Sequence, residues 1–79
     1  MNQFFSTGSL VYTTIEGIVW NIVDSQRDVQ DTRNFLRIFM KDEYALILSS
    51  SNRFVYVLFN DGGFGWVRKS SVKPIKDRV

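Results

Sequence analysis

The stretch RFVYVLF-NDGG-FGWVR, residues 53–68, decides the fold class. Residues 53–59 and 64–68 are rich in aromatic and β-branched side chains and are bounded by turn residues, a composition typical of β-strands. The four residues between the runs, NDGG at 60–63, favour the positive φ angles of a tight hairpin. The stretch therefore predicts two antiparallel strands joined by a short turn.

The rest of the chain continues this pattern, and no helical period of useful length interrupts it. Polar residues at 24–33, 41–42 and 49–52 separate the runs and are expected to form loops or turns. We therefore predict an all-β fold of five to seven short antiparallel strands, and the length favours a small barrel. The remaining expected strands lie at 9–15, 17–23, 34–40, 43–49 and 72–75.

A chain of 79 residues builds one domain and buries only about 60–65% of its unfolded surface. We place this domain at residues 8–76, with an N-terminal arm at 1–7 and a tail at 77–79. Seven Phe, three Tyr and two Trp supply much of the apolar area. The expected core consists of Val11, Ile18, Leu36, Ile38, Ala45, Ile47, Val55, Val57, Val67 and Val72, and Trp20 is also expected to be buried.

The chain contains neither Cys nor His, and this absence narrows its chemistry. No disulfide, thiolate or imidazole metal site, Ser-His pair or Cys-His pair can form. Asp24, Asp28 and Asp31 match no calcium-loop spacing, and Asp42 with Glu43 fits a turn. We therefore expect no enzyme, no catalytic residue, no cofactor, no metal and no small-molecule substrate.

Charge is distributed unevenly along the chain. Residues 53–79 carry six basic and two acidic side chains, a net charge of +4, against +2 for the whole chain. A basic segment of this kind suits either a solvated surface or contact with a polyanion. No apolar run approaches the roughly 20 residues of a membrane span, and no secretion signal is recognisable, so we expect no membrane partner and an intracellular protein or part of an assembly made inside a cell.

From residue 41 onward the chain resembles the Src-homology-3-like (SH3-like) barrels. KDEYALIL at 41–48 is similar to the segment leading into the family's second strand, and RFVYVLF-NDGG-FGWVR is similar to its third and fourth strands. GWVRKSSVKPI at 65–75 resembles the family's ending, which implies a bend at Gly65 and a 3₁₀ turn at 69–71. The SH3-like resemblance implies that residues 17–23 and 34–40 are the arms of an enlarged first loop. The chain also resembles small accessory proteins of tailed bacteriophages in its overall pattern, which implies a location in the host cytoplasm or a virion.

The family's peptide-binding groove is only partly matched. Carried over by position, the groove's Trp falls on Phe54, its Pro on Arg68 and the Tyr of its 3₁₀ turn on Ser71. Because only one of these three positions is aromatic, the resemblance does not imply ordinary recognition of Pro-rich peptides.

The segment NFLRIFM, residues 34–40, permits two registers. Strict alternation puts Leu36, Ile38 and Met40 in the core, with a bulge near Met40. The family resemblance instead places Phe39 in the core. Under the first register, which we favour because Arg37 would be costly to bury without a partner, one face carries a basic and aromatic stripe. The stripe consists of Arg33, Phe35, Arg37, Phe39 and Lys41.

Two functions follow from these patterns. The leading expectation is a non-enzymatic structural or protein-interaction module, an accessory component of a phage-type assembly, whose partner is an assembly component or a second copy. The alternative is a nucleic-acid-binding small barrel that uses the stripe and the basic C-terminal third. Expected partner-binding residues are Phe35, Phe39, Phe54, Phe64 and Trp66, and expected nucleic-acid-binding residues are Arg33, Arg37, Lys41, Arg68, Lys69 and Lys73.

Overall fold

The alternating runs of the sequence form strands in the computed structural model, which describes residues 5–21 and 35–78. Within these ranges there are seven strands, two 3₁₀ helices that follow the sixth and seventh strands, and no α-helix. The elements in chain order are β1 (Leu10–Thr13), β2 (Gly17–Trp20), β3 (Phe35–Phe39), β4 (Tyr44–Ser50), β5 (Phe54–Phe59), β6 (Phe64–Arg68), η3 (Lys69–Ser71), β7 (Val72–Pro74) and η4 (Ile75–Arg78).

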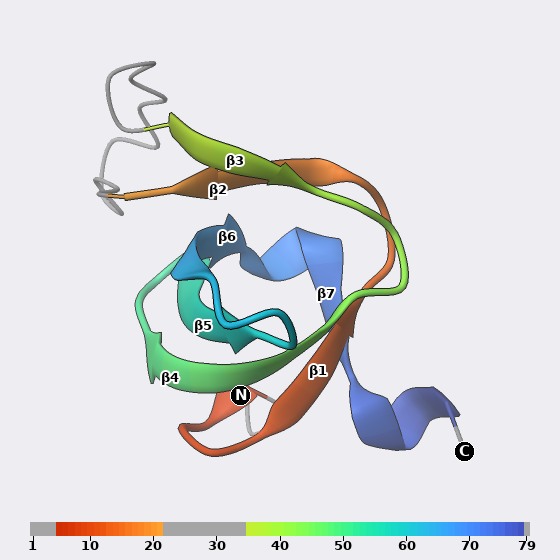
Figure 1. Ribbon diagram of the computed structural model, residues 1–79. Coiled ribbons are helices and arrows are strands. Elements are labelled where there is room, and N and C mark those ends of the chain that lie inside the picture. Colours follow the sequence, from red (N-terminus) through yellow and green to blue (C-terminus); the bar gives the residue numbers. More distant parts are fainter. Residues whose placement is uncertain (1–4, 22–34, 79) are drawn as a thin grey trace.

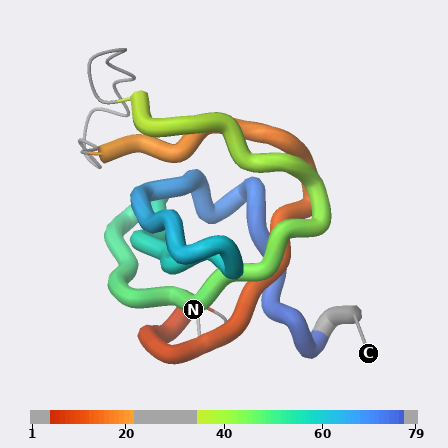
Figure 2. Tube along the Cα trace, viewed as in Figure 1, coloured from red at the N-terminus to blue at the C-terminus, as the bar shows by residue number. Residues whose placement is uncertain are grey.

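The strands form one antiparallel sheet in the order β3-β2-β6-β5-β4-β1-β7. Figures 1 and 2 show the sheet curling, so that β2 and β3 lie on one side of the molecule and β1 and β4 on the other. The all-β prediction is therefore confirmed. No pairing among the described residues joins the edge strands β3 and β7, so barrel closure stays a prediction.

The hairpin between β5 and β6 forms where the NDGG turn predicts it. The Phe59 N–H donates to the Gly63 carbonyl at 2.7 Å, and the Gly62 N–H donates to the Phe59 carbonyl at 3.0 Å. Gly62 has a φ of 92°, in the region that favours glycine. Asp61 caps the turn, because its Oδ1 accepts a hydrogen bond from the Gly63 N–H at 2.9 Å.

A bulge in β3 shifts its pairing with β2. Ile18 pairs with Ile38 and Val19 with Arg37, but Trp20 pairs with Phe35, so the pairing passes over Leu36. The expected bulge near Met40 therefore lies at Leu36 instead.

The register expected for β3 from strict alternation is wrong. Leu36, Ile38 and Met40 are 44%, 57% and 56% exposed, whereas Phe39 is 1% exposed. Phe39 packs against Phe59 with 6.1 Å between ring centroids. The larger aromatic ring thus takes the interior position, and Arg37 turns inward beside it.

Seven of the ten expected core residues are buried, and Trp20 is buried too. Ile18 is 36% exposed because it pairs with the outward-facing Ile38. The expectation that Ile18, Leu36 and Ile38 lie in the core is therefore wrong. Phe59, Phe39 and Val19 belong to the core cluster in their place. The central cluster consists of Val11, Val19, Phe39, Ala45, Ile47, Val55, Val57, Phe59, Val67 and Val72.

The two ends of the described chain fold back onto the sheet. Residues 69–71 form the expected 3₁₀ turn, and β7 then pairs with β1, with Val72 opposite Thr13. Phe5, from the segment expected to form an arm, packs against the core, and the Gly8 N–H donates to the Ile47 carbonyl at 2.8 Å. Residues 1–4 lie outside the described ranges.

Candidate functional site

Arg37, the central cation of the expected stripe, is half-buried and bound by acidic side chains of its own chain. Its Nη1 lies 3.0 Å from Asp61 Oδ2 and its Nη2 lies 3.4 Å from Glu43 Oε1. Its guanidinium carbon lies 4.6 Å from the centroid of the Phe59 ring. These contacts compensate the desolvation of a side chain that is 33% exposed. Arg37 therefore links β3 to the β5–β6 hairpin and is not presented to a partner.

The other members of the stripe do not share one face either. Phe35 pairs with Trp20 and Arg37 with Val19, so the bulge puts Phe35 and Arg37 on opposite faces. Phe39 is buried, Lys41 is exposed in the turn after β3, and Arg33 lies outside the described residues. The residues of the expected stripe thus do not form one surface. The expectation that Phe39 contacts a partner is corrected, because this side chain is buried in the core.

Among the expected partner-binding aromatics, Phe54 is also buried, at 1% exposure. The guanidinium carbon of Arg68, its partner on β6, lies 5.5 Å from the Phe54 ring centroid. The expectation that Phe54 contacts a partner at the surface is therefore corrected as well. Phe64 and Trp66 do reach the surface, and Phe64 is 57% exposed. Tyr56 joins them, with ring centroids 6.1 Å from Phe64 and 5.1 Å from Trp66.

Four apolar side chains line up across the middle of the sheet. Leu10 pairs with Leu46, Leu46 with Leu58, and Leu58 with Phe64. Residues directly opposite each other in antiparallel strands share a face, so these side chains form a continuous row about 14 Å long across four strands. Leu10 is 52% exposed, and Leu46 and Leu58 are partly exposed. We call Leu10, Leu46, Leu58 and Phe64 the apolar row.

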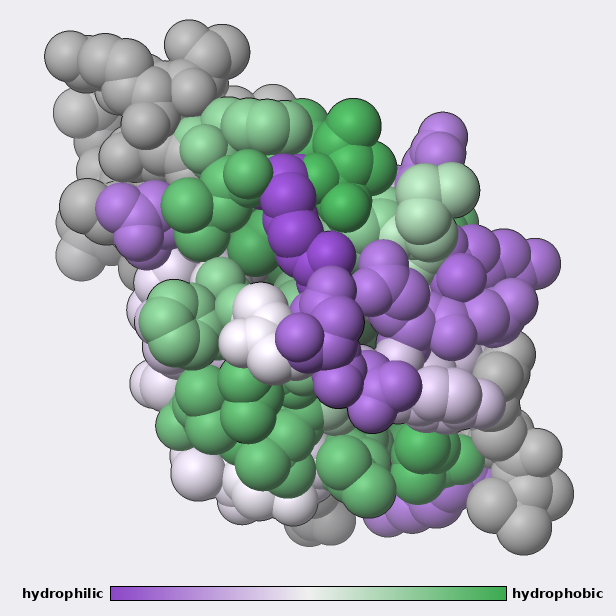
Figure 3. All heavy atoms as spheres, in the orientation of Figure 1, coloured by the Kyte–Doolittle hydropathy of each residue, from purple (hydrophilic) through white to green (hydrophobic). Residues whose placement is uncertain are grey.

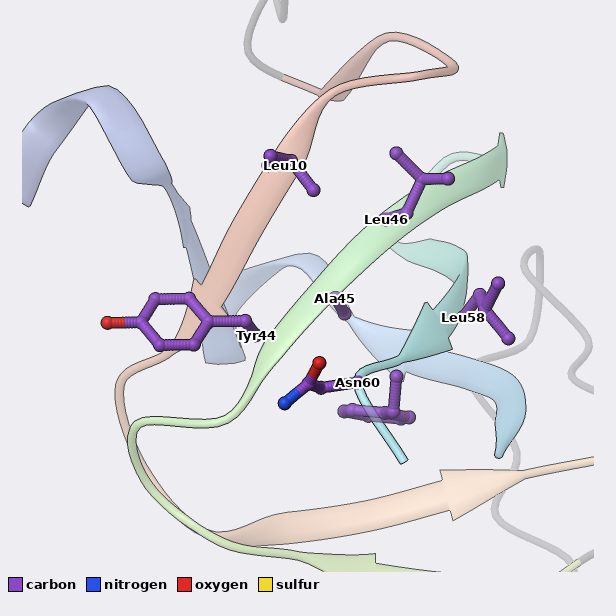
Figure 4. Close-up of a pocket in the computed structure, with 7 residues that line it drawn as sticks. Leu10, Tyr44, Ala45, Leu46, Leu58 and Asn60 are labelled. Carbon is purple, nitrogen blue, oxygen red and sulfur yellow. The ribbon is translucent and has the colours of Figure 1, made fainter. Parts of the chain in front are cut away.

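The apolar row borders a pocket of about 280 Å³. Figure 4 shows its lining residues on the neighbouring strands β1, β4 and β5, with Asn60 just beyond β5. Tyr44 at its rim is 40% exposed and pairs with Tyr12, which in turn pairs with the exposed Lys73 on β7. In Figure 3, hydrophobic spheres gather over β4 and, beyond a hydrophilic band, over β2 and β3.

The sequence reasoning missed Leu10, Leu46 and Leu58 as site residues. Each lies at an ordinary outward position of an alternating strand, and single exposed leucines carry no signal. Only the pairing register brings them into one row with Phe64. The Leu–Leu–Leu–Phe alignment is visible in the sequence once that register is known.

A second pocket, basic in character, lies where β5 begins and β6 ends. The Lys69 N–H donates to the Arg53 carbonyl at 2.9 Å and brings the two segments together. The pocket has a volume of about 290 Å³, and none of the described residues that line it is acidic. We call it the basic pocket, and its lining residues are Asn52, Arg53, Arg68, Lys69 and Ser70.

Comparison with family models, with curated proteins and with solved structures finds no match to this chain. Nor do the residues that the structure describes bring together three or more acidic side chains in a group that could hold a metal ion. In the same part of the chain, no helix is long and apolar enough to cross a membrane. The candidate surfaces therefore stand on their own geometry: the apolar row and the basic pocket.

Proposed function

We propose that this protein is a non-enzymatic protein-interaction module and that the apolar row is its docking surface. The observation that carries the proposal is the alignment of Leu10, Leu46, Leu58 and Phe64 across four paired strands, with both ends of the row more than half exposed. Contiguous exposed apolar patches on small soluble domains mark interaction sites, because leaving them in water costs free energy that a partner recovers.

The surroundings of the row match the composition of protein interfaces. Interface cores are rich in aromatic and depleted in charged side chains, and the energetic anchors sit near pockets that exclude water. Tyr44 flanks the row, the 280 Å³ pocket adjoins it, and no charged residue lines that pocket among the described residues. The four strands that carry the row are central in the sheet, so the surface is held rigidly.

The partner that fits is a different protein with an apolar contact strip and an acidic residue at its edge. Lys73 stands on the rim, two strands away from Tyr44 and opposite Tyr12, and would face that acidic residue. The chain's net charge of +2 disfavours self-pairing, which would bring like charges together. We further propose that this partner is a component of a bacteriophage-type assembly, because the sequence pattern resembles that of small phage accessory proteins.

The row is preferred over the other exposed apolar surface, which lies on β2 and β3. There Ile18 and Ile38 pair with each other, and Met40 follows. The residues that join β2 to β3, 22–34, lie outside the described ranges. Substitutions in the apolar row and on the β2–β3 surface can therefore be compared to test which surface binds the partner.

Site-specific photo-crosslinking in the producing cell tests the proposal. A photoreactive phenylalanine analogue at Leu46 should give one discrete adduct with a different protein, whereas the same analogue at Ile38 should not. The purified adduct partner should then bind the unmodified protein. A dimer of this chain as the sole Leu46 adduct, or the same adduct from both positions, would contradict the proposal.

A further inference from the structure

Three outward side chains of β6 follow one another at every second residue. They are Phe64, Trp66 and Arg68, and all three reach the surface at least in part. Two residues of a strand span roughly 6.7 Å, so two aromatic rings and a guanidinium stand in line at regular intervals. This line continues the alternation of FGWVR in the sequence.

Tyr56 on β5 widens the aromatic part of this line. It pairs with Trp66, and its ring lies 5.1 Å from the Trp66 ring and 6.1 Å from the Phe64 ring, centroid to centroid. Tyr56, Phe64 and Trp66, the aromatic cluster, thus form a connected platform on one face of the β5–β6 hairpin.

The platform leads directly into the basic pocket through Arg68. The guanidinium of Arg68 lies over the buried Phe54 ring, which supports it from below. Lys69 is supported in a similar way, since its Nζ lies 5.9 Å from the centroid of the Phe5 ring. Three basic residues line this pocket, together with Asn52 and Ser70.

Aromatic faces beside a basic pocket suit one class of ligand in particular. Single-stranded nucleic acid offers unpaired bases, which stack on aromatic side chains, and phosphates, which pair with guanidinium and ammonium groups. We propose that the β5–β6 face binds single-stranded nucleic acid, with bases on the aromatic cluster and backbone phosphates in the basic pocket. This site is separate from β3 and goes beyond the protein-docking function.

The same observations disfavour two other polyanions. A duplex hides its base faces inside the stack, so the aromatic cluster would gain nothing from it. An acidic peptide could neutralise the basic pocket, but its carboxylates have no flat faces to lie on Tyr56 and Phe64. The proposal therefore predicts a preference for unpaired bases and not merely for negative charge.

Fluorescence anisotropy with a labelled oligothymidylate at low salt tests the proposal. The single strand should bind, a duplex should bind more weakly, and polyglutamate at equal charge concentration should not displace the strand. Affinity should fall with salt at a logarithmic slope of roughly −0.7 per neutralised phosphate, and Arg68→Gln should flatten this slope by about that amount.

Matched substitutions distinguish binding at this site from nonspecific effects of charge and of exposed apolar surface. Phe64→Ala should weaken binding at least about fivefold, as loss of a stacked base does, whereas Ile38→Ala should not, although both side chains are 57% exposed. Arg68→Gln should weaken binding of the oligonucleotide. Lys41→Gln, which removes one positive charge from the turn after β3, should leave the affinity unchanged. Arg53→Gln replaces Arg68→Gln if circular dichroism shows that the latter unfolds.

Three results would overturn the inference: no binding at low salt, equal binding of polyglutamate and the oligonucleotide, or equal effects of the Arg68 and Lys41 substitutions. Failure here is distinguishable from failure of the protein-docking function, because Leu46 lies outside the aromatic cluster and Arg68 lies outside the apolar row, although Phe64 belongs to both surfaces. Leu46→Asp should leave oligonucleotide binding unchanged, and Arg68→Gln should leave the Leu46 photo-adduct of the preceding section unchanged.

Discussion

Arg37 Nη1 lies 3.0 Å from Asp61 Oδ2, and this ion pair ties the edge strand β3 to the tip of the β5–β6 hairpin. The pair joins residues that are 24 positions apart in the chain. It explains how an arginine can turn inward beside Phe39: its charge meets two carboxylates and its flat face covers Phe59. The contact that anchors β3 thus also neutralises its central cation.

Replacing Arg37 with Met should destabilise the protein by about 1–2 kcal/mol. The substitution keeps much of the side-chain volume but removes both ion pairs and the contact of the guanidinium with the Phe59 ring. Urea unfolding measures the change, with Lys41→Met as the control for loss of an exposed cation. A loss for Arg37→Met no greater than that of the control would show that the network is only a solvated surface pair.

Thr13 holds the turn between β3 and β4. It is fully buried, its hydroxyl donates to the Met40 carbonyl at 2.6 Å, and its oxygen accepts from the Glu43 N–H at 2.8 Å. Thr13→Val keeps the shape and leaves both backbone groups without this partner, so it should cost about 3 kcal/mol.

Thr13→Ser retains the hydroxyl and should cost only about 1 kcal/mol for the lost methyl group. Urea unfolding gives both values, and hydrogen exchange at the Glu43 amide should accelerate in the Val variant alone. Equal losses for the two variants would assign the role of Thr13 to packing and not to its hydrogen bonds.

Gly65 permits β6 to pass close to β2. A Cβ at this position would lie 2.4 Å from Val19 Cγ1 and 3.1 Å from the Trp20 carbonyl oxygen. Gly65→Ala should therefore destabilise the protein by about 2–3 kcal/mol through overpacking. Adding Val19→Ala should restore part of that loss in thermal unfolding.

Gly62→Ala provides the comparison for Gly65→Ala. Nothing lies within 4 Å of its added Cβ, but its φ of 92° strains an alanine by about 1 kcal/mol. Val19→Ala should not rescue this variant. Rescue of both variants, or of neither, would contradict the steric account of Gly65.

Local patterns predicted the strands because alternation and turn residues are read over a few neighbouring positions. The NDGG hairpin and the expected core residues of β4, β5 and β6 followed from such patterns and are confirmed. The 3₁₀ turn at 69–71, which the family resemblance implied, is also present. The faces of β3 did not follow from local patterns, because Phe39 takes the interior position opposite Gly17 while Ile38 and Met40 face outward. The inward side of β3 also carries Arg37, whose contacts with Asp61 and Glu43 depend on tertiary structure.

The candidate surfaces also divide into residues that the sequence predicted and residues that only the tertiary structure brings together. Phe64 and Trp66 are visible as an outward pair on one strand, so sequence reasoning found them. The apolar row needed three pairing registers at once, and the basic pocket needed the contact between Lys69 and Arg53. Neither can be read from a single run of residues.

The affinity of the protein found as the Leu46 photo-adduct, measured by isothermal titration, tests the central claim most directly. Leu46→Asp and Leu58→Asp should each weaken binding roughly 30-fold, as expected for an interface hot spot, with unchanged thermal stability. Ile38→Asp, which places the same charge on the other apolar surface, should leave the affinity within about twofold. Equal loss from Ile38→Asp and Leu46→Asp, or no loss from either row variant, would contradict the account of the apolar row as the docking surface.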